Sequence, residues 1–315
     1  MSTPAPFFQE VAKGPDNVRA LWVTARDGAR LRIALWPGGT RGTVLLFPGR
    51  TEYVEKYGIM ASELERIGLS TIAIDWRGQG LADRSLEDRA TGHVGDFTDY
   101  QHDVAAMLST ARDQGLPEPY FLIAHSMGGC IGLRAVLEHL PVKAAVFTGP
   151  MWGIKISRSL RPVAWVLSWA ARKVGHGYRY VPGTSPDTYV TAAMFEDNLL
   201  TTDPGMFEYM TEQLRAHPDL ALGGPSLHWL YEALIETRRL ARQPSPDLPC
   251  LTFLGTNERI VDTAAVHARM AMWPKGRLQM VEAGEHEVMM EGRDARRRLV
   301  EDLDRDVVPF VGVFP

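Results

Sequence analysis

Short apolar runs alternate with amphipathic helical patterns along most of this chain, and this alternation limits the possible folds more than any other feature. The apolar runs have the length and composition of strands that are buried on both faces; they span residues 42–47, 70–75, 119–124, 142–149, 249–255 and 277–283. Helical patterns follow at residues 54–67, 97–114, 127–138, 263–272 and 293–307. This order predicts an α/β fold, in which a mostly parallel sheet carries helices on both faces.

The beginning of the chain has a different pattern. Residues 18–24 and 31–36 flank the pair Asp27-Gly28, which is a strong signal for a tight hairpin turn. We therefore expect an antiparallel ribbon at one edge of the sheet.

The alternation stops between residues 151 and 243, where strand signals disappear and two helical stretches with Pro/Gly loops take their place. Residues 242–249 then carry three prolines and are expected to form a stiff connection back into the sheet. This pattern predicts a core made of residues 1–151 and 244–315, with a helical cap, or lid, inserted at residues 152–243.

The segment FLIAHSMGG, residues 121–129, places Ser126 directly after a buried strand and before a helix. This is the pattern of a nucleophile elbow, a tight turn that exposes the serine hydroxyl above the sheet and requires small residues on either side. Gly128 and Gly129 meet this requirement, whereas Ala124 stands where the first glycine of the GxSxG pattern is usual. Ser126 is therefore the predicted nucleophile.

A serine nucleophile needs a base and a carboxylate, and both follow later strands in the order serine, acid, histidine. His286 comes after the strand at residues 277–283 and is the predicted base. Glu258 and Asp262 both follow the strand at residues 249–255. We favour Glu258 as the acid and keep Asp262 as the alternative, because Asp262 lies where a carboxylate would cap the next helix.

The oxyanion that forms during acyl transfer needs two N–H donors. One is expected to be the backbone amide of Met127, directly after the nucleophile. The other should come from the loop after the strand at residues 42–47, where we favour the backbone amide of Arg50 and where Gly49 lets the chain approach the substrate closely.

Two other histidines and one pair that resembles a metal-binding motif are further candidates for chemistry. His125 adjoins the nucleophile on the same turn and is expected to pack rather than to act as the base, and His93 is expected to order its loop. The pair His286-Glu287 resembles the start of a zinc-binding HExxH motif, but Met290 stands where the second histidine would be. The sequence therefore predicts no metal site.

Composition excludes several classes of protein. The formal net charge of −4 gives no general attraction to nucleic acid. Two cysteines, Cys130 and Cys250, are too few for a disulfide framework, and the first residues lack the basic and apolar pattern of a signal peptide. Apolar stretches also fall short of the ~20 residues that a membrane-spanning helix requires. We therefore expect a cytoplasmic protein.

The chain resembles the lysophospholipase and monoacylglycerol lipase group of serine α/β-hydrolases, and bacterial lysophospholipases are the nearest match. The resemblance covers nearly the whole chain and rests on the segments FPGRTEYVEKY, IDWRGQGLAD, GHVGDFTDYQHDV, AHSMGG, LGTNERIVD and GEHEV. It implies an α/β-hydrolase fold with a cap after the strand that ends near Thr148, a triad acid at Glu258 and an oxyanion amide at Arg50. Pro48 and Ala124 depart from the family's usual histidine and glycine, which puts the shape of the acyl site in doubt.

The predicted cap has two features that suit a lipid substrate. Half of the eight tryptophans lie in it and are candidates for substrate contacts, with packing of the cap as the alternative: Trp152, Trp165, Trp169 and Trp229. Residues 151–180 also contain six basic residues and no acidic one, namely Lys155, Arg158, Arg161, Arg172, Lys173 and Arg179. This segment is expected either to rest on anionic lipid at the inner membrane surface or to be a solvated basic face.

These observations favour an enzyme that cleaves the acyl ester of lysophospholipids or monoacylglycerols through an acyl-Ser126 intermediate, without a cofactor. One alternative keeps the same triad but acts on small esters or on carbon–carbon bonds. Another alternative, from a different class, is a non-catalytic hydrolase-like protein that only holds a ligand. An intact set of serine, acid and histidine speaks against the second alternative.

Overall fold

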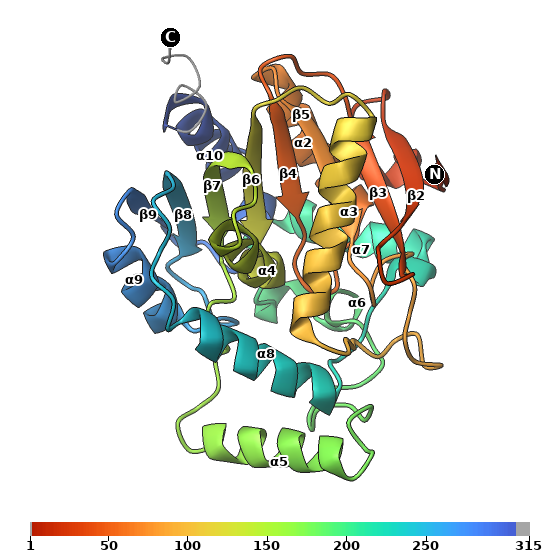
Figure 1. Ribbon diagram of the computed structural model, residues 1–315, viewed down its shortest axis with the longest axis vertical. Coiled ribbons are helices and arrows are strands. Elements are labelled where there is room, and N and C mark those ends of the chain that lie inside the picture. The colour runs from red at the N-terminus through yellow and green to blue at the C-terminus, as the bar shows by residue number, and fades with distance from the viewer. Residues whose placement is uncertain (1, 307–315) are drawn as a thin grey trace.

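The structure is a computed structural model that describes residues 2–306 (Figure 1). This part of the chain holds a nine-stranded sheet in the order β1-β2-β3-β5-β4-β6-β7-β8-β9. Strands β4 to β9 run parallel to one another, whereas β1, β2 and β3 are antiparallel to their neighbours. The strands are β1 Thr3–Pro4, β2 Arg19–Thr24, β3 Arg30–Trp36, β4 Thr43–Phe47, β5 Ser70–Asp75, β6 Tyr120–His125, β7 Val142–Thr148, β8 Cys250–Gly255 and β9 Gly276–Val281. The predicted parallel centre and the antiparallel ribbon at the sheet edge are both confirmed.

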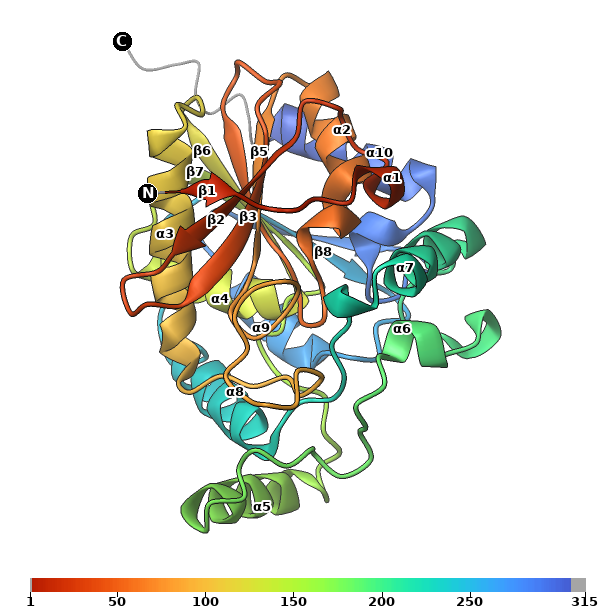
Figure 2. The same cartoon turned by 90° about the vertical axis from the view of Figure 1, so that its right-hand side faces the viewer.

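Helices cover both faces of the sheet (Figure 2). Helices α2 (Gly58–Arg66) and α10 (Arg293–Asp306) lie on one face, and α3 (Tyr100–Asp113), α4 (Ser126–Leu137) and α9 (Thr263–Ala271) lie on the other. The short helices are α1 Gln9–Ala12, η1 Val54–Tyr57, η2 Phe97–Asp99, η3 Phe195–Asp197, η4 Pro218–Leu220 and η5 Val288–Met290. The predicted α/β class is therefore confirmed.

Two hydrophobic clusters, one on each face, hold the sheet between the helices. Successive side chains of a strand point to opposite faces, so Leu45 and Phe47 of β4 enter the cluster on the α3 side, and Val44 and Leu46 enter the cluster on the α2 side. All five residues of β4 are buried. The continuous apolar sequence of the central strands follows from this burial on two sides.

The structure differs from the prediction, or describes it only in part, at the last predicted strand and the last predicted helix. The strand at residues 277–283 was expected to be buried on both faces, but β9 is the last strand of the sheet and most of its residues are exposed or half-buried. An edge strand has a neighbour on one side only, so its outer side stays open to solvent. The helix predicted at residues 293–307 corresponds to α10, and Val307 lies outside the described residues.

The segment between β7 and β8 is more helical than its sequence suggested. It holds α5 (Arg161–Lys173), the short α6 (Tyr189–Ala192), α7 (Pro204–Ala216) and α8 (Leu227–Leu240), which makes three long helices where two were expected. Helices α7 and α8 contribute side chains to the two hydrophobic clusters, whereas α5 lies outermost, against α8 (Figure 1, Figure 2). Among residues 2–306, every helix is too short or too polar to cross a bilayer.

A buried ionic group fastens the antiparallel ribbon to the parallel sheet. The side chain of Arg32, on β3, is fully buried. Its Nε donates to the Asp75 carboxylate at the end of β5 over 2.7 Å, and its two terminal nitrogens donate to Glu55 in η1 over 2.7 Å each. The guanidinium therefore joins three separate segments of the core.

Removal of this guanidinium should be costly, because two buried carboxylates would lose their cation. We expect Arg32→Met to lower the free energy of unfolding by about 3–5 kcal/mol, measured by urea denaturation. Arg30→Met on the same strand is the matched control. Arg30 and its partner Asp83 are both largely exposed, so its loss should cost less than about 1 kcal/mol. Equal losses for the two variants would contradict this account.

Candidate active site

The turn that carries Ser126 has the geometry of a nucleophile elbow. Strand β6 ends at His125 and helix α4 begins at Ser126, whose φ is +49°, a value that non-glycine residues rarely adopt. The turn is also crowded, because a Cβ at Gly128 would lie 2.2 Å from the carbonyl oxygen of Phe47. Only glycine at this position lets α4 approach the end of β4, as the sequence pattern predicted.

The departure at Ala124 is accommodated by a second small residue. A Cβ built on Gly132, two turns into α4, would lie 3.1 Å from the Cβ of Ala124. The alanine methyl group therefore occupies the space that a side chain at residue 132 would need. The elbow forms without the first glycine of the usual pattern because Gly132 is a glycine instead.

The three residues predicted to form a triad come together at the carboxyl ends of the parallel strands. His286 Nε2 lies 2.8 Å from Ser126 Oγ, and His286 Nδ1 lies 2.6 Å from Glu258 Oε2. A carboxylate can only accept, so Nδ1–H donates to Glu258 and leaves Nε2 to accept the serine hydroxyl. All three residues are buried. The structure thus holds an imidazole between a hydroxyl and a carboxylate, the arrangement that activates a serine.

Glu258 is kept ionised by its surroundings. Burial favours the protonated form, but hydrogen bonds from His286 and from the amides of Ile260 and Val261 outweigh it and lower the pKa of Glu258. The two amides donate to Oε1 over 2.6 and 3.1 Å, so each carboxylate oxygen has its own partners. An ionised carboxylate at this place stabilises the positive imidazolium that forms when His286 takes a proton.

The alternative acid, Asp262, lies elsewhere. Its carboxylate is 3.3 Å from the guanidinium of Arg161, and it is partly exposed. Asp262 occupies the N-cap position of α9, as expected, but its side chain makes no capping hydrogen bond. The carboxylate beside His286 is that of Glu258.

A glycine that the sequence reading passed over makes room for this arrangement. Gly149 follows β7 with a φ of +47°, and a Cβ there would lie 3.1 Å from His286 Nδ1 and 3.2 Å from Glu258 Oε2. Any side chain at this position would press on the hydrogen bond between the two groups. The sequence carried one signal for it, since Gly149 ends a predicted strand.

The two residues predicted to supply the oxyanion donors lie on segments near Ser126. The amide of Met127 belongs to the first turn of α4, where backbone N–H groups have no intrahelical acceptor. Arg50 follows Gly49 on the loop after β4, and this loop lies against the first turn of α4 because of the close contact at Gly128. Arg50 and Ser126 line the same cavity.

The cavity beside Ser126 has a volume of about 550 Å³. Its walls combine Ser126 and His286 with apolar side chains from the segment between β7 and β8, among them Val190, Leu199, Leu200, Met210, Leu214 and Trp229. This volume and this apolar lining are typical of a small-molecule site.

Of the four tryptophans that the sequence offered as candidates, one lines the cavity. Trp229 lines the cavity, whereas Trp152 is buried in the core against Phe147 and Trp273. Trp165 packs on Tyr231 between α5 and α8, and Trp169 is half exposed on α5. None of these three side chains belongs to the cavity wall.

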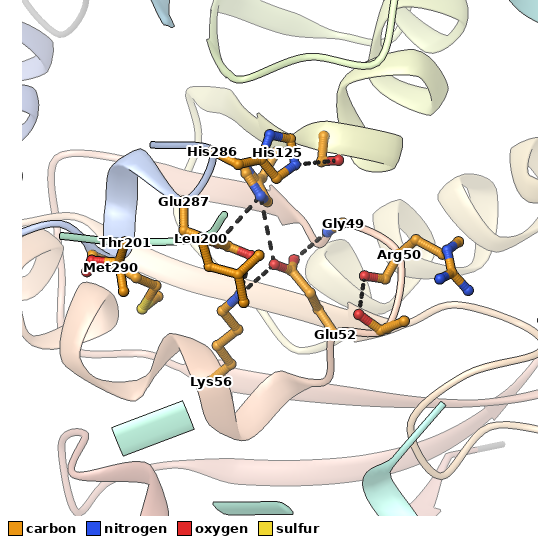
Figure 3. A network of polar contacts seen from close by, with 12 residues as sticks. Gly49, Arg50, Glu52, Lys56, His125, Leu200, Thr201, His286, Glu287 and Met290 are labelled. Atoms are coloured by element: carbon orange, nitrogen blue, oxygen red, sulfur yellow. Dashed lines mark hydrogen bonds and ion pairs between the residues drawn. The ribbon is translucent and has the colours of Figure 1, made fainter. Parts of the chain in front are cut away.

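A second buried polar group lies beside His286 (Figure 3). Lys56 Nζ lies 2.5 Å from Glu52 and 2.7 Å from Glu287, and His125 Nε2 lies 3.2 Å from Glu287. Glu52 also accepts hydrogen bonds from the amide of Gly49 and from the hydroxyl of Tyr57. We call Glu52, Lys56, His125 and Glu287 the buried ionic cluster.

The buried ionic cluster connects the loops that carry the predicted site residues. Glu52 holds the loop that contains Arg50, His125 precedes Ser126, and Glu287 follows His286. His125 Nδ1–H donates to the carbonyl of Thr148 over 2.9 Å and its Nε2 lies 3.2 Å from Glu287, so both ring nitrogens are engaged within the protein, although the residue borders the cavity. Sequence reasoning missed Glu52, Lys56 and Glu287, because each charged residue taken alone reads as exposed.

The groups of the cluster match one another in charge. Burial favours the neutral form of His125, but the carboxylates of Glu287 and Glu52 outweigh it and raise the pKa of the imidazole. Burial likewise favours protonated Glu287, yet Lys56 and His125 hold its pKa well below the usual value. The side chains of Glu52, His125 and Glu287 are close enough to one another to hold a metal ion. The ammonium of Lys56, however, already supplies a cation to both carboxylates.

His93, the other histidine considered from sequence, orders a contact between loops. Its Nδ1 lies 2.8 Å from the hydroxyl of Ser226, which also caps α8, and its ring packs near His228. Burial is the main cause that lowers the pKa of His93 to about 4, so the ring is neutral at physiological pH. This is the structural role that was expected.

Comparison with known proteins agrees with the geometry. The profile of a family described as serine aminopeptidase, S33, matches residues 38–293. The chain belongs to this family. Lysophospholipase L2 of Escherichia coli strain K12 is 31% identical over 267 residues, with 81% of this chain and 76% of that protein covered. Probable lysophospholipase L2 of Haemophilus influenzae is 27% identical over 267 residues, with 84% and 83% covered.

Solved structures show the same fold. A soluble variant of monoglyceride lipase from Saccharomyces cerevisiae, bound to a substrate analogue, aligns with a TM-score of 0.69 at 19% identity and covers 90% of this chain and 92% of that chain. A lipase in an open form aligns with a TM-score of 0.70 at 16% identity and covers 94% and 100%. The predicted α/β-hydrolase fold and the resemblance to the lysophospholipase and monoacylglycerol lipase group are confirmed, and the protein is a serine hydrolase.

The raised pKa of His125 makes part of the stability depend on pH. A histidine whose pKa is higher in the folded state stabilises the fold fully below its unfolded pKa of about 6.5, and this contribution is lost as pH rises through the folded pKa. We therefore expect the difference in unfolding free energy between the wild type and His125→Gln to be largest below about pH 6 and to shrink as the pH rises through the raised pKa of His125. Urea denaturation at several pH values measures it.

The control for this experiment is His267→Gln, which removes an exposed imidazole on α9. Its effect on the unfolding free energy should not follow the same trend with pH. A difference for His125→Gln that stays constant across the pH range would show that the buried ionic cluster does not favour the charged imidazole.

Proposed function

We propose that this protein hydrolyses the acyl ester of lysophospholipids or monoacylglycerols through an acyl-Ser126 intermediate. The observation that carries the proposal is the hydrogen-bonded chain from Ser126 Oγ through His286 to Glu258, which opens onto an apolar cavity. The names of the relatives support the substrate class, since they include lysophospholipase L2 and monoglyceride lipase.

The steps of the reaction follow from the two hydrogen bonds of the His286 ring. His286 Nε2 takes the proton of Ser126 as Oγ attacks the ester carbonyl, and Glu258 stabilises the imidazolium. The amides of Met127 and Arg50 donate to the oxyanion of the tetrahedral intermediate. His286 then returns the proton to the leaving glycerol oxygen, and a water molecule activated by the same imidazole releases the fatty acid and restores Ser126.

The cavity supports a substrate with one acyl chain. Its apolar walls offer a long chain many contacts and offer a small ester few, which favours the lipid over the small-ester alternative. The intact hydrogen bonds among the three residues favour an enzyme over a hydrolase-like binding protein. We further propose that residues 152–243 act as the lid, because their side chains form the wall of the cavity that faces Ser126 and His286.

Substitution within the triad tests this mechanism. Ser126→Ala and His286→Ala should each lower kcat/KM for a fatty-acyl ester roughly 10⁴-fold or more while the fold remains intact by circular dichroism. Glu258→Gln should lower it roughly 10³–10⁴-fold, because the imidazole loses its orientation and its counter-charge. Asp262→Asn is the matched control at the neighbouring carboxylate and should have little effect. A larger loss for Asp262→Asn than for Glu258→Gln would refute the assignment of the acid.

A peripheral contact with lipid is the second part of the proposal, and its support comes from α5. Five large apolar side chains of α5 and its flanks are at least half exposed: Leu160 58%, Val163 55%, Val166 64%, Trp169 50% and Val174 67%. An amphipathic helix with such an outer face is suited to the surface of a bilayer.

The basic residues contribute less than their number suggested. Arg161 pairs with Asp262 and Arg172 pairs with Glu232, so both are engaged within the protein. The other four basic residues are exposed and remain available for anionic headgroups: Lys155, Arg158, Lys173 and Arg179. The apolar face of α5 is therefore the larger part of the proposed contact.

The contact predicts a difference between dispersed and soluble substrates. Val166→Ser combined with Trp169→Ser should weaken binding to anionic phospholipid vesicles roughly tenfold, because both side chains would lose an apolar environment. Vesicle co-sedimentation measures this binding. Met272→Ser, which removes an equally exposed apolar side chain far along the chain after α9, is the control. Equal vesicle binding by the wild type and the α5 variant would exclude this surface.

A further inference from the structure

The side chain of Arg50 carries a charge that no carboxylate of residues 2–306 neutralises. Its guanidinium donates one hydrogen bond, from Nη1 to the carbonyl of Gly223 over 2.8 Å, and its Cζ lies 5.7 Å from the centre of the Trp229 ring. Most of its N–H donors therefore have no protein acceptor. Arg50 is half-buried, and a guanidinium that is partly withdrawn from solvent is stabilised by an anionic partner.

Among residues 2–306, Arg50 differs from the other buried or half-buried arginines in lying on the cavity wall; Arg296, for example, is buried and donates to the carbonyl of Glu291 over 2.9 Å, but lies outside that wall. Arg32 and Arg134 pair with carboxylates. Arg84 has no carboxylate partner, but it donates to the carbonyls of Gly78 and Gly80 over 2.6 and 2.7 Å and lies outside the cavity wall. Arg269 donates to backbone carbonyls and to a serine hydroxyl, and it too lies outside the wall.

Arg50 forms part of the wall of the cavity beside Ser126. Arg50, Gly223 and Trp229 all line that cavity together with Ser126, so the two groups that contact the guanidinium are themselves part of its wall. The guanidinium points away from the buried ionic cluster and is not paired with Glu52 (Figure 3). Burial outweighs the neighbouring Tyr100 hydroxyl and lowers the pKa of Arg50 to about 10, so the group is still charged at neutral pH.

We propose that the Arg50 guanidinium binds the phosphate of a lysophospholipid headgroup. Arg50 then contacts the substrate twice, with its backbone amide at the ester carbonyl oxygen and with its side chain at the phosphate. This inference rests on the proposed function and narrows its substrate class to lysophospholipids. Phosphate accepts paired N–H donors from a guanidinium in a planar geometry that an ammonium cannot match.

The covalent lengths agree with this assignment. Two bond counts are equal. The first runs from the backbone nitrogen of Arg50, the proposed oxyanion donor, to its Cζ. The second runs from the ester carbonyl carbon to the phosphorus atom of a 1-acyl-glycerophospholipid. A substrate whose carbonyl oxygen lies at the backbone amide can therefore bring its phosphate to the guanidinium of the same residue. A monoacylglycerol has no anion there and leaves the charge unpaired, which lowers its affinity in the transition state as well as in the ground state.

The test compares two substrates that differ in the headgroup only, a lysophosphatidylcholine and a monoacylglycerol with the same acyl chain. In Arg50→Gln, the ratio of kcat/KM for the lysophospholipid to kcat/KM for the monoacylglycerol should fall roughly tenfold or more, because a hydrogen-bonded charge pair is lost. Arg50→Lys should give an intermediate ratio, since the charge remains without the planar donors. Arg84→Gln is the matched control and should keep the wild-type ratio.

A second readout does not depend on lipid turnover. Hydrolysis of a short neutral ester should be inhibited by sn-glycerol 3-phosphate in the wild type, and the inhibition constant should rise roughly tenfold in Arg50→Gln. An unchanged inhibition constant, or an unchanged substrate ratio in a folded Arg50→Gln, overturns the phosphate site while the proposed ester hydrolysis stands. If the wild type cleaves neither lipid, the proposed function fails, and the inhibition by sn-glycerol 3-phosphate still decides whether Arg50 binds a phosphate.

Discussion

The hydrogen-bonded chain from Ser126 through His286 to Glu258 is the interaction on which the rest of this structure depends. Its members come from loops after β6, β9 and β8, so it forms only if the parallel sheet sets the spacing of these strands. The sheet does this because the carboxyl ends of parallel strands meet at one edge, where their loops converge. Gly149 belongs to the same requirement, since it leaves the space in which the imidazole meets the carboxylate.

Two buried ionic groups surround this chain and give the loops their places. Arg32 joins the antiparallel ribbon to Glu55 and Asp75, and the buried ionic cluster of Glu52, Lys56, His125 and Glu287 lies beside His286. In both groups, cations and carboxylates are matched, which keeps the penalty of withdrawing charges from water tolerable. Directional partners of this kind also define one arrangement of a loop more sharply than apolar contacts do.

The substrate side of the molecule is less completely paired, and this contrast carries the functional inferences. The outer face of α5 exposes apolar side chains that a globular surface normally buries, and the guanidinium of Arg50 has no carboxylate beside it. A lysophospholipid in a bilayer would supply what both features lack, an apolar environment for α5 and a phosphate for Arg50. The substrate proposal, the lipid contact and the phosphate site thus describe one ligand that meets the protein at three places.

The sequence by itself determined the fold class and the order of the strands that carry the site, because period, turn chemistry and chain order are local or sequential properties. It also predicted Ser126, Glu258 and His286 as a triad, and the structure brings these three side chains within hydrogen-bond distance. The sequence misjudged β9 and the number of long helices in the insertion, since edge position and helix formation depend on what packs nearby. The sequence favoured Glu258 over Asp262, but only the tertiary structure shows that the Asp262 carboxylate lies against the guanidinium of Arg161. The buried ionic cluster and the unpaired charge of Arg50 also required the folded chain, because whether a charged side chain has a partner is settled by residues far away in sequence.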